Sequence, residues 1–194
     1  MGKIFYILGK SASGKDSIFH ELKKDPSLGL KGITMYTTRP RRVDEIDGED
    51  YHFITEKKLD EFKREGKVIE LRTYQTIHGP WSYGTMDDGQ IDPKEDYLMV
   101  GVLESYCSMR DYFGKDQVIP IYIQVEDGER LARALGRERQ QTTPKYAELC
   151  RRFLSDSEDF SEEKLQAAGI RKRYENDEME RCIQEIREMI HSCR

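Results

Sequence analysis

Hydrophobic residues recur with strand-like and helix-like spacing at both ends of the chain. Residues 3–8 form a short apolar run that ends in glycine, which predicts a buried strand. Residues 15–24 carry apolar side chains at helical spacing and stop before Pro26, so we expect a helix there. From residue 97 onward the two patterns alternate, with strands expected at 97–103, 118–125 and 170–174, and helices at 105–113, 128–139, 146–154 and 178–191. Alternating strands and helices predict a parallel sheet with helices on its faces.

The stretch from residue 35 to residue 94 interrupts this alternation. Short strand-like runs at 33–37, 51–53, 67–73 and 81–85 surround a charged loop at 39–50. A helix is expected at 56–65, with Thr55 as its N-cap. Polar segments at 89–96 and 140–144 are expected to be connections. We therefore expect one α/β domain over residues 1–194, with a core from 1–34 and 95–194 and a strand-rich subdomain inserted at 35–94.

The composition is that of an acidic chain with local clusters of arginine. The net charge is −5 at pH 7 over 194 residues. This charge argues against general affinity for nucleic acid, because such affinity depends on neutralising phosphates. Arginines gather at 39–42, 137–139 and 151–152, as expected for small anionic ligands held in a cleft. For any single cluster, a solvated charged surface remains the simpler explanation.

Cysteine spacing and hydropathy favour a cytoplasmic protein. The four cysteines lie far apart without a C-x-x-C pair, so we expect reduced thiols rather than a disulfide framework or a zinc site. The N-terminus enters the first predicted strand without a cleavable signal, and no apolar run reaches membrane-spanning length. We expect no membrane or nucleic-acid partner.

The segment between the first predicted strand and helix carries the pattern G-x-x-x-x-G-K, from Gly9 to Lys15. In this context the pattern predicts a P-loop, because glycines let the backbone curl and aim its N–H groups at phosphate oxygens. Lys15 is expected to reach the outer phosphates. The alternative is an ordinary glycine–serine turn. The expected ATP-binding residues of this segment are Gly9, Ser11, Ala12, Ser13, Gly14, Lys15, Asp16 and Ser17.

Asp16 stands where this pattern usually has a serine or threonine whose hydroxyl binds Mg²⁺. A carboxylate is also a good ligand for Mg²⁺, which makes Asp16 a candidate metal ligand. A negative charge in the first turn of a helix is favourable in its own right, so a helix-stabilising role stays open as well. With the P-loop, the fold class becomes a P-loop three-layer sandwich around a central parallel sheet, with the strand-rich subdomain and a small lid added to it.

The most distinctive segment runs from Thr37 to Phe53 as TTRPRRVDEIDGEDYHF. It resembles the signature T-T-R-x-P-R-x-G-E-x-x-G-x-D-Y-x-F of the guanylate kinases, which are P-loop enzymes that phosphorylate GMP. The positions in register are Arg39, Arg42, Glu45, Gly48, Asp50, Tyr51 and Phe53. The resemblance continues at residues 66–70, 83–85, 133–137, 151–152 and 176–177, and so covers nearly the whole chain.

The resemblance implies transfer of the γ-phosphoryl group of Mg²⁺-ATP to GMP or dGMP by a monomer or homodimer. Residues 35–94 become the subdomain that binds the nucleoside monophosphate, and residues 136–150 the lid. The implied acceptor residues are Arg39, Arg42, Tyr51 and Tyr83 for the phosphate, Glu70 and Thr85 for the base, and Arg152 between the two phosphates. The implied donor residues are Arg133, Arg137 and Asn176, and the implied catalytic residues are Lys15, Arg39, Arg137 and Arg152. Planar arginine forks and phenolic hydroxyls suit phosphate binding, and positioning with charge neutralisation is most of what phosphoryl transfer needs.

Three departures from the family pattern concern the acceptor base. Met35 replaces a serine expected four residues before Arg39. The predicted strand 97–103 lacks the aspartates expected there, and its nearest acid is Glu104. The stretch from Glu70 to Tyr83 is longer than in the family and adds residues 78–81, of which His78 and Trp81 either line the acceptor site or are turn residues with a packed aromatic. Phosphate-binding residues are thus better preserved than base-binding ones.

Two alternatives to a GMP kinase stay open. One is a kinase of the same fold that phosphorylates another nucleotide or a sugar phosphate. The other is a guanylate-kinase-like interaction module without catalysis. Simpler roles also exist for single residues: an exposed i, i+4 pair for Arg133 and Arg137, packing for the two tyrosines, and a surface carboxylate for Glu70.

Overall fold

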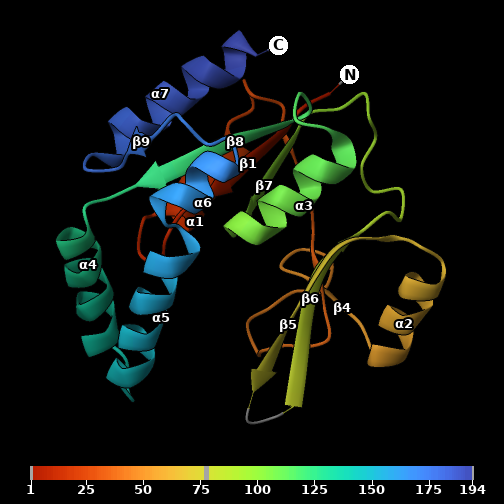
Figure 1. Ribbon diagram of the computed structural model, residues 1–194, viewed down its shortest axis with the longest axis horizontal. Coiled ribbons are helices and arrows are strands. Elements are labelled where there is room, and N and C mark those ends of the chain that lie inside the picture. The colour runs from red at the N-terminus through yellow and green to blue at the C-terminus, as the bar shows by residue number, and fades with distance from the viewer. Residues whose placement is uncertain (1, 77–78, 194) are drawn as a thin grey trace.

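The computed structural model describes residues 2–76 and 79–193 and is an α/β arrangement of one core and two projecting parts (Figure 1). Its strands are β1 (Ile4–Leu8), β2 (Lys31–Gly32), β3 (Tyr36–Thr37), β4 (His52–Phe53), β5 (Val68–Thr76), β6 (Gly79–Met86), β7 (Tyr97–Gly101), β8 (Val118–Gln124) and β9 (Tyr174–Glu175). Its helices are α1 (Lys15–Lys24), α2 (Glu56–Arg64), α3 (Leu103–Phe113), α4 (Asp127–Arg139), α5 (Tyr146–Asp159), α6 (Glu162–Ala167) and α7 (Met179–Ser192).

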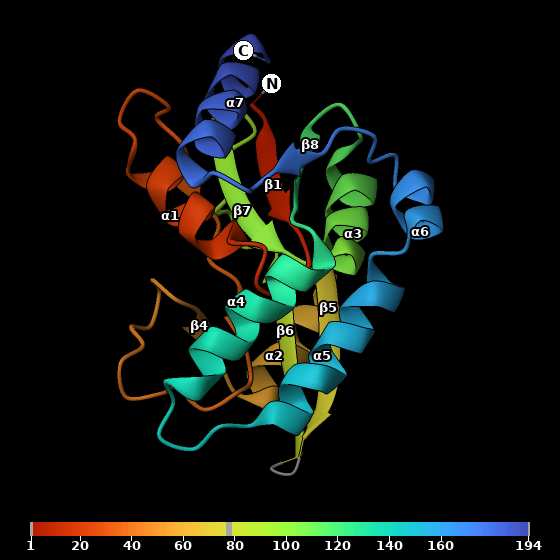
Figure 2. The same cartoon turned by 90° about the vertical axis from the view of Figure 1, so that its left-hand side faces the viewer.

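The core is a parallel sheet in the order β2-β7-β1-β8-β9. β1 lies in its middle and is buried along its whole length. Phe5 and Ile7 face one side of the sheet, where α1 and α7 cover them, whereas Tyr6 and Leu8 face α3 and α6 on the other side. Figure 2 shows the two helix pairs on opposite sides of the strands. The three-layer sandwich with a central parallel sheet is therefore confirmed.

A second, four-stranded sheet in the order β4-β3-β6-β5 occupies the interrupted stretch of the sequence. β6 pairs antiparallel with both β3 and β5, and β4 adds in parallel to β3. One face of this sheet packs on α2, through Leu59 and Phe62 against Tyr36 and Met86. The other face carries Glu70, Arg72 and Tyr74 of β5 opposite Thr85, Tyr83 and Trp81 of β6, because residues two apart on a strand share a face.

Local signals explain the elements whose limits match the sequence prediction. α1 begins after Gly14, whose φ of 85° suits glycine, buries Ile18 and Leu22 one turn apart, and ends before Asp25-Pro26. The side chain of Thr55 accepts a hydrogen bond from the Lys58 N–H and caps α2 as expected.

Other boundaries differ from the prediction. Of the run expected as one strand at 33–37, only Tyr36–Thr37 forms a strand, β3 of the second sheet, whereas β2 of the core precedes the run at Lys31–Gly32. The expected strand 97–103 ends at Gly101 because α3 already begins at Leu103. The strand expected at 170–174 is only Tyr174–Glu175, and the short α6 was not predicted.

The helices α5 and α7 form where the sequence predicts them, with differences in detail. α5 runs to Asp159, five residues beyond its expected end. In α7 Cys182, Ile183, Ile186 and Ile190 are buried, whereas Met179 at its first turn is 38% exposed. Of the expected turn at 78–80, His78 lies outside the described residues, and Gly79 and Pro80 open β6. Within the described residues, no helix combines the length and the apolar character needed to cross a membrane.

Candidate active site

The loop between β1 and α1 has the backbone conformation that a phosphate loop requires. Ala12 and Gly14 are both left-handed, with φ of 63° and 85°. A Cβ on Gly9 would lie 2.7 Å from the Ile123 carbonyl oxygen, and one on Gly14 would lie 2.4 Å from Nδ2 of Asn176. Close packing therefore favours glycine at both positions, and the left-handed turn favours it at Gly14 as well.

Asn176 lies against this loop although 160 residues of sequence separate the two segments. Its Nδ2 donates to the Ser13 carbonyl oxygen at 2.8 Å, in a buried contact. The Ser13 hydroxyl is itself buried and has no hydrogen-bond partner among the described residues. A bound phosphate oxygen would satisfy such a group, so the interior of the loop fits an anion.

Lys15 and Asp16 follow the loop in the first turn of α1. The Lys15 ammonium lies 3.6 Å from Oδ2 of Asp16, and the Asp16 side chain is exposed. Within 2–76 and 79–193, no group of three or more His, Cys, Asp or Glu side chains forms a preassembled metal site. The Asp16 carboxylate could bind Mg²⁺ only together with a phosphate. This is a common arrangement, in which one carboxylate, phosphate oxygens and water molecules bind the ion.

A cavity of about 520 Å³ lies between α4, α5 and the phosphate loop. Ser11 of the loop, Arg137 of α4 and Arg152 of α5 line it, and Arg42 reaches it from the loop at 39–50. Nη2 of Arg152 donates to the Ser11 hydroxyl at 3.2 Å. Three of the predicted phosphate-binding arginines thus share one cavity with the phosphate loop, although they come from three separate segments.

Arg130 anchors this region and was not predicted from the sequence. It is 1% exposed and donates to the Ser11 carbonyl oxygen at 3.0 Å and to Oδ1 of Asp127 at 2.8 Å. Its guanidinium also lies 3.4 Å from Oδ2 of Asp156 and 4.5 Å from the centroid of the Phe153 ring. The only sequence signal for it is the acidic residue three positions earlier on α4, which also occurs on solvated helices.

Asp156 is the second unpredicted residue at the loop. Its Oδ2 accepts a hydrogen bond from the Ser11 N–H at 2.7 Å. One backbone N–H group of the loop is therefore already bonded to a carboxylate. On the opposite side, Lys10 donates to Asp127 at 3.2 Å. Burial would raise the pKa of Asp127, but hydrogen bonds from Arg130 and Lys10 outweigh it and hold that pKa below its usual value.

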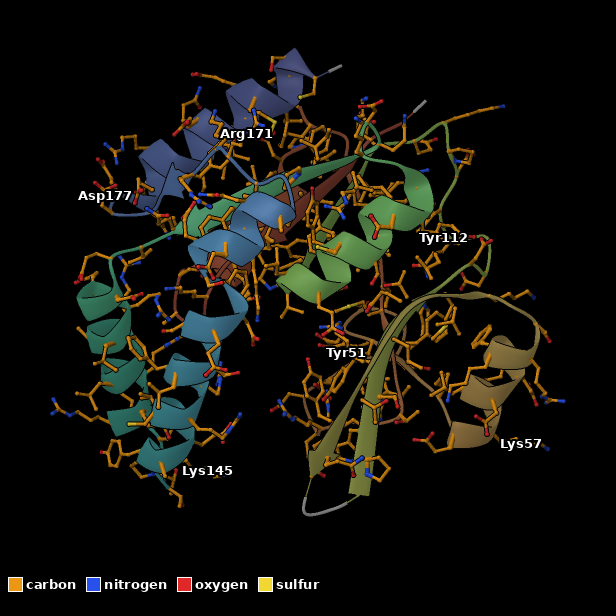
Figure 3. The ribbon with its side chains drawn as sticks, in the orientation of Figure 1. Tyr51, Lys57, Tyr112, Lys145, Arg171 and Asp177 are labelled. Carbon is orange, nitrogen blue, oxygen red and sulfur yellow. The ribbon has the colours of Figure 1, made fainter. Side chains whose placement is uncertain are left out.

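Arg133 and Arg137 lie one turn apart on α4, but their side chains have different neighbours. Arg133 donates to the carbonyl oxygen of Asn176 at 3.1 Å and pairs with Glu129 at 2.9 Å. This contact places Arg133 next to the phosphate loop through Asn176, whereas Arg137 lines the cavity toward α5. Lys145, labelled in Figure 3, marks the tip of the α4–α5 hairpin, far from the core.

Three predicted acceptor residues, Glu70, Tyr83 and Thr85, share one face of the second sheet, and Tyr51 and Arg39 pack beside it. The rings of Tyr51 and Tyr83 are 5.8 Å apart, and the Arg39 guanidinium lies 5.6 Å from the centroid of the Tyr51 ring. Glu70 and Thr85, on the same face, touch directly, since the Thr85 hydroxyl donates to Oε1 of Glu70 at 3.2 Å. Figure 3 labels Tyr51 beside this sheet.

Arg39 is already engaged within the loop at 39–50. Its two terminal nitrogens pair with the two carboxylate oxygens of Glu45 at 2.7 and 3.0 Å, and the backbone N–H of Arg42 donates to Glu45 as well. The hydrogen bond from Arg39, followed by that from the Arg42 backbone, lowers the pKa of Glu45 to about 2. A phosphate would therefore meet an Arg39 that Glu45 orients and partly neutralises.

Glu70 is not the free carboxylate that the sequence suggested. It is buried, and it accepts hydrogen bonds from Nε of Arg72 at 3.0 Å and from Nη2 of Arg72 at 3.5 Å. The same Nη2 lies 3.8 Å from Sδ of Met35. The surface-carboxylate alternative for Glu70 is wrong, and Arg72 is a further unpredicted residue of the site.

The strand without its expected aspartates packs tightly at its end. A Cβ on Gly101 would lie 2.1 Å from the Tyr6 hydroxyl, so the side chain of Tyr6 fills the space beside β7. Burial, as the largest influence, raises the pKa of Tyr6 above its ordinary value, which keeps this phenol neutral.

The parallel sheet, the curled loop and the arginine-lined cavity beside it define a P-loop nucleotide-binding protein. Residues 1–89 match the family model described as guanylate kinase. The guanylate kinase of Mycoplasma mobile is 40% identical over 85 residues, which are 44% of this chain and 40% of that protein. That of Thermotoga maritima is 31% identical over 123 residues, 63% of this chain and 49% of that protein. The matched stretch thus spans half or less of these curated relatives.

Among solved structures, the guanylate kinase of Anaplasma phagocytophilum is similar, with a TM-score of 0.64 and 18% identity over 98% of this chain and 85% of that one. At this identity the likeness shows the fold. The resemblance to the guanylate kinase family is therefore confirmed, in sequence over residues 1–89 and in fold over nearly the whole chain.

Proposed function

We propose that this chain is an ATP-dependent nucleoside monophosphate kinase that transfers the γ-phosphoryl group to GMP or dGMP. The observation that carries the proposal is that one cavity is lined both by Ser11 of the phosphate loop and by Arg42 of the loop at 39–50. Two anionic substrates with adjacent phosphates fit a cavity lined by cations from both sides. The named guanylate kinases among its relatives support the same activity.

On the donor side, the backbone N–H groups from Ser11 to Lys15 bind the ATP phosphates at the positive end of α1. The Lys15 ammonium follows the charge of the transferring group. Asn176 holds the loop in shape through Ser13, and Arg133 lies beside it. The carboxylate of Asp156 withdraws from the Ser11 N–H when a phosphate takes its place, because one N–H cannot serve both.

On the acceptor side, Arg39, Arg42 and the hydroxyls of Tyr51 and Tyr83 hold the monophosphate. Glu70 accepts the N1 and N2 hydrogens of guanine, with Thr85 beside it. Glu70, Tyr83 and Thr85 share one face of the second sheet and Tyr51 packs against Tyr83, which supports the joint use of these four residues.

Transfer itself needs positioning and charge neutralisation more than covalent chemistry. Arg137 and Arg152 neutralise the charge that develops between donor and acceptor, and their place in one cavity supports this role. We propose that residues 136–150 act as the lid and residues 35–94 as the acceptor flap, which close to exclude water from the transferring group.

We propose Mg²⁺ as the metal cofactor, with Asp16 as its protein ligand. Bound there, the ion would neutralise negative charge on the phosphates. The exposed carboxylate of Asp16, next to the Lys15 ammonium, supports this assignment. A cytoplasmic setting agrees with the four free cysteines, and a monomer or homodimer remains a prediction.

The test is ADP formation from ATP and Mg²⁺ with GMP, dGMP, AMP, UMP and CMP in turn. Turnover on GMP or dGMP supports the proposal, and turnover only on another acceptor refutes it. ATP binding without turnover on any acceptor would favour a non-catalytic interaction module. Lys15→Ala is expected to abolish transfer with the fold intact, and full activity of that variant would exclude the phosphate-loop role.

One observation favours a second candidate, a kinase of the same fold with a different acceptor. Arg72 engages the carboxylate of Glu70 that guanine would need.

A further inference from the structure

The pair formed by Glu70 and Arg72 is buried within the second sheet. Their side chains are 1% and 9% exposed. Oε2 of Glu70 accepts from Nε of Arg72 at 3.0 Å, and Oε1 accepts from Nη2 of Arg72 at 3.5 Å and from the Thr85 hydroxyl at 3.2 Å. Both carboxylate oxygens are therefore engaged by groups of the protein.

Arg72 lies on the acceptor side of the sheet and not behind it. It stands directly opposite Tyr83 in the β5–β6 register, and its Nη2 reaches Met35 at 3.8 Å. Met35 replaces a serine of the family pattern that would contact the base. The guanidinium thus fills the region bounded by the three groups expected to recognise the base: Glu70, Thr85 and the residue at position 35.

A guanidinium and the edge of guanine offer a carboxylate the same hydrogen bonds. Arginine presents two parallel N–H donors, which match the two oxygens of a carboxylate. Guanine presents its N1–H and N2–H groups in the same arrangement. One carboxylate cannot accept both pairs at once.

We propose that Arg72 is a specificity-determining residue that competes with guanine for Glu70. The inference rests on the proposed acceptor role of Glu70. Guanine binds only after Arg72 withdraws, so the preference for GMP over other nucleoside monophosphates is weakened. Adenine does not compete in this way, because its edge places one acceptor beside one donor group.

The test is equilibrium binding of GMP and AMP, measured by calorimetry without ATP. The native protein is expected to bind GMP less than tenfold more tightly than AMP. Arg72→Ala is expected to bind GMP at least tenfold more tightly than the native protein, which equals about 1.4 kcal/mol, with AMP binding unchanged. AMP carries the same phosphate and therefore reports any change in charge or fold that is not specific to guanine.

Two further variants keep the test decisive. Arg64→Ala removes an exposed arginine from α2 in the same subdomain and is expected to leave both affinities unchanged. Arg72→Gln keeps a neutral donor and most of the side-chain bulk, and it replaces Arg72→Ala if thermal unfolding shows that the alanine variant does not fold. Unchanged or weaker GMP binding in the folded variant, or an equal gain for AMP, would overturn the inference. So would a native protein that already prefers GMP by tenfold or more.

The inference and the proposed function fail in different ways. Adding Glu70→Ala to Arg72→Ala is expected to remove the gain in GMP binding, because the gain acts through the carboxylate. Tighter GMP binding without phosphoryl transfer would refute the kinase proposal alone. Transfer to GMP whose affinity does not respond to Arg72 would refute the competition alone.

Discussion

Replacing Arg130 by alanine tests whether the phosphate loop is held in place by α4. The substitution removes a 1% exposed guanidinium that binds the Ser11 carbonyl oxygen and Asp127, contacts Asp156, and lies on the Phe153 ring. It leaves a partly buried carbonyl group and a partly buried carboxylate without their cation.

The expected loss of stability follows from these contacts. Removing one partner of a buried pair costs about 3–5 kcal/mol. Asp127 is about half exposed, so its share is worth no more than ~1 kcal/mol. We expect a total loss of about 3 kcal/mol, or a melting temperature lower by about 6–12 °C for a chain of this size.

The assay is urea and thermal unfolding of Arg130→Ala beside Arg151→Ala. Arg151, on α5, is 65% exposed and pairs with Glu148 on the same helix, a contact worth about 0.5 kcal/mol or less. ATP binding by Arg130→Ala is expected to weaken as well, because Ser11 loses its anchor. If the two variants unfold within 0.5 kcal/mol of each other, the anchoring role of Arg130 is wrong.

Three further predictions concern the loop, the acceptor segment and the metal. Gly14→Ala is expected to destabilise the fold and weaken ATP binding, since its φ of 85° and the 2.4 Å approach of Asn176 Nδ2 exclude a methyl group; ATP binding equal to the native protein would contradict this. The ion pair of Glu45 with Arg39 lowers the pKa of Glu45 from 4.5 to about 2, so its contribution to stability is complete above pH 4.5 and is lost as the pH falls through about 2. Unfolding of Glu45→Gln and of the native protein should therefore converge in that window, and a constant difference down to pH 2 would exclude the pair as its source. Asp16→Ala should shift the Mg²⁺ dependence of ADP formation to higher concentration, and an unaltered titration would leave the carboxylate as a helix-terminal charge.

The phosphate loop and the helix after it could be predicted because their signals are local. Gly14 permits the left-handed turn, and Ile18 and Leu22 mark the buried side of α1. The proposed role of the loop as an anion site also rests on short-range geometry, since consecutive N–H groups and a helix end supply the donors.

The limits of β2 and β3 could not be predicted. The apolar run at 33–37 contains only β3, and β2 forms just before it, because pairing with β7 or with β6 decides which residues join which sheet. A similar limit applies to the α4–α5 region, where the sequence identified Arg133 and Arg137 as a pair. Their different partners, Asn176 and the cavity, depend on how α4 packs.

Arg72, Arg130 and Asp156 were missed for a common reason. Each has a nearby opposite charge or an ordinary helical context in the sequence, which is also typical of exposed ion pairs. Burial gives these charged side chains a structural role, because a charge removed from water must be fully paired. That burial arises only when β6, α5 or the phosphate loop covers them.

By itself, the sequence determined the parallel core, the phosphate loop and the family resemblance, and it identified the candidate anion-binding residues, since these depend on periodicity and on spacing along the chain. The tertiary structure alone decided which of those residues share a cavity and which carboxylates are already occupied. Glu70 is the clearest case: its proposed role follows from its position in the chain, but its pairing with Arg72 depends on a sheet face that forms only on folding.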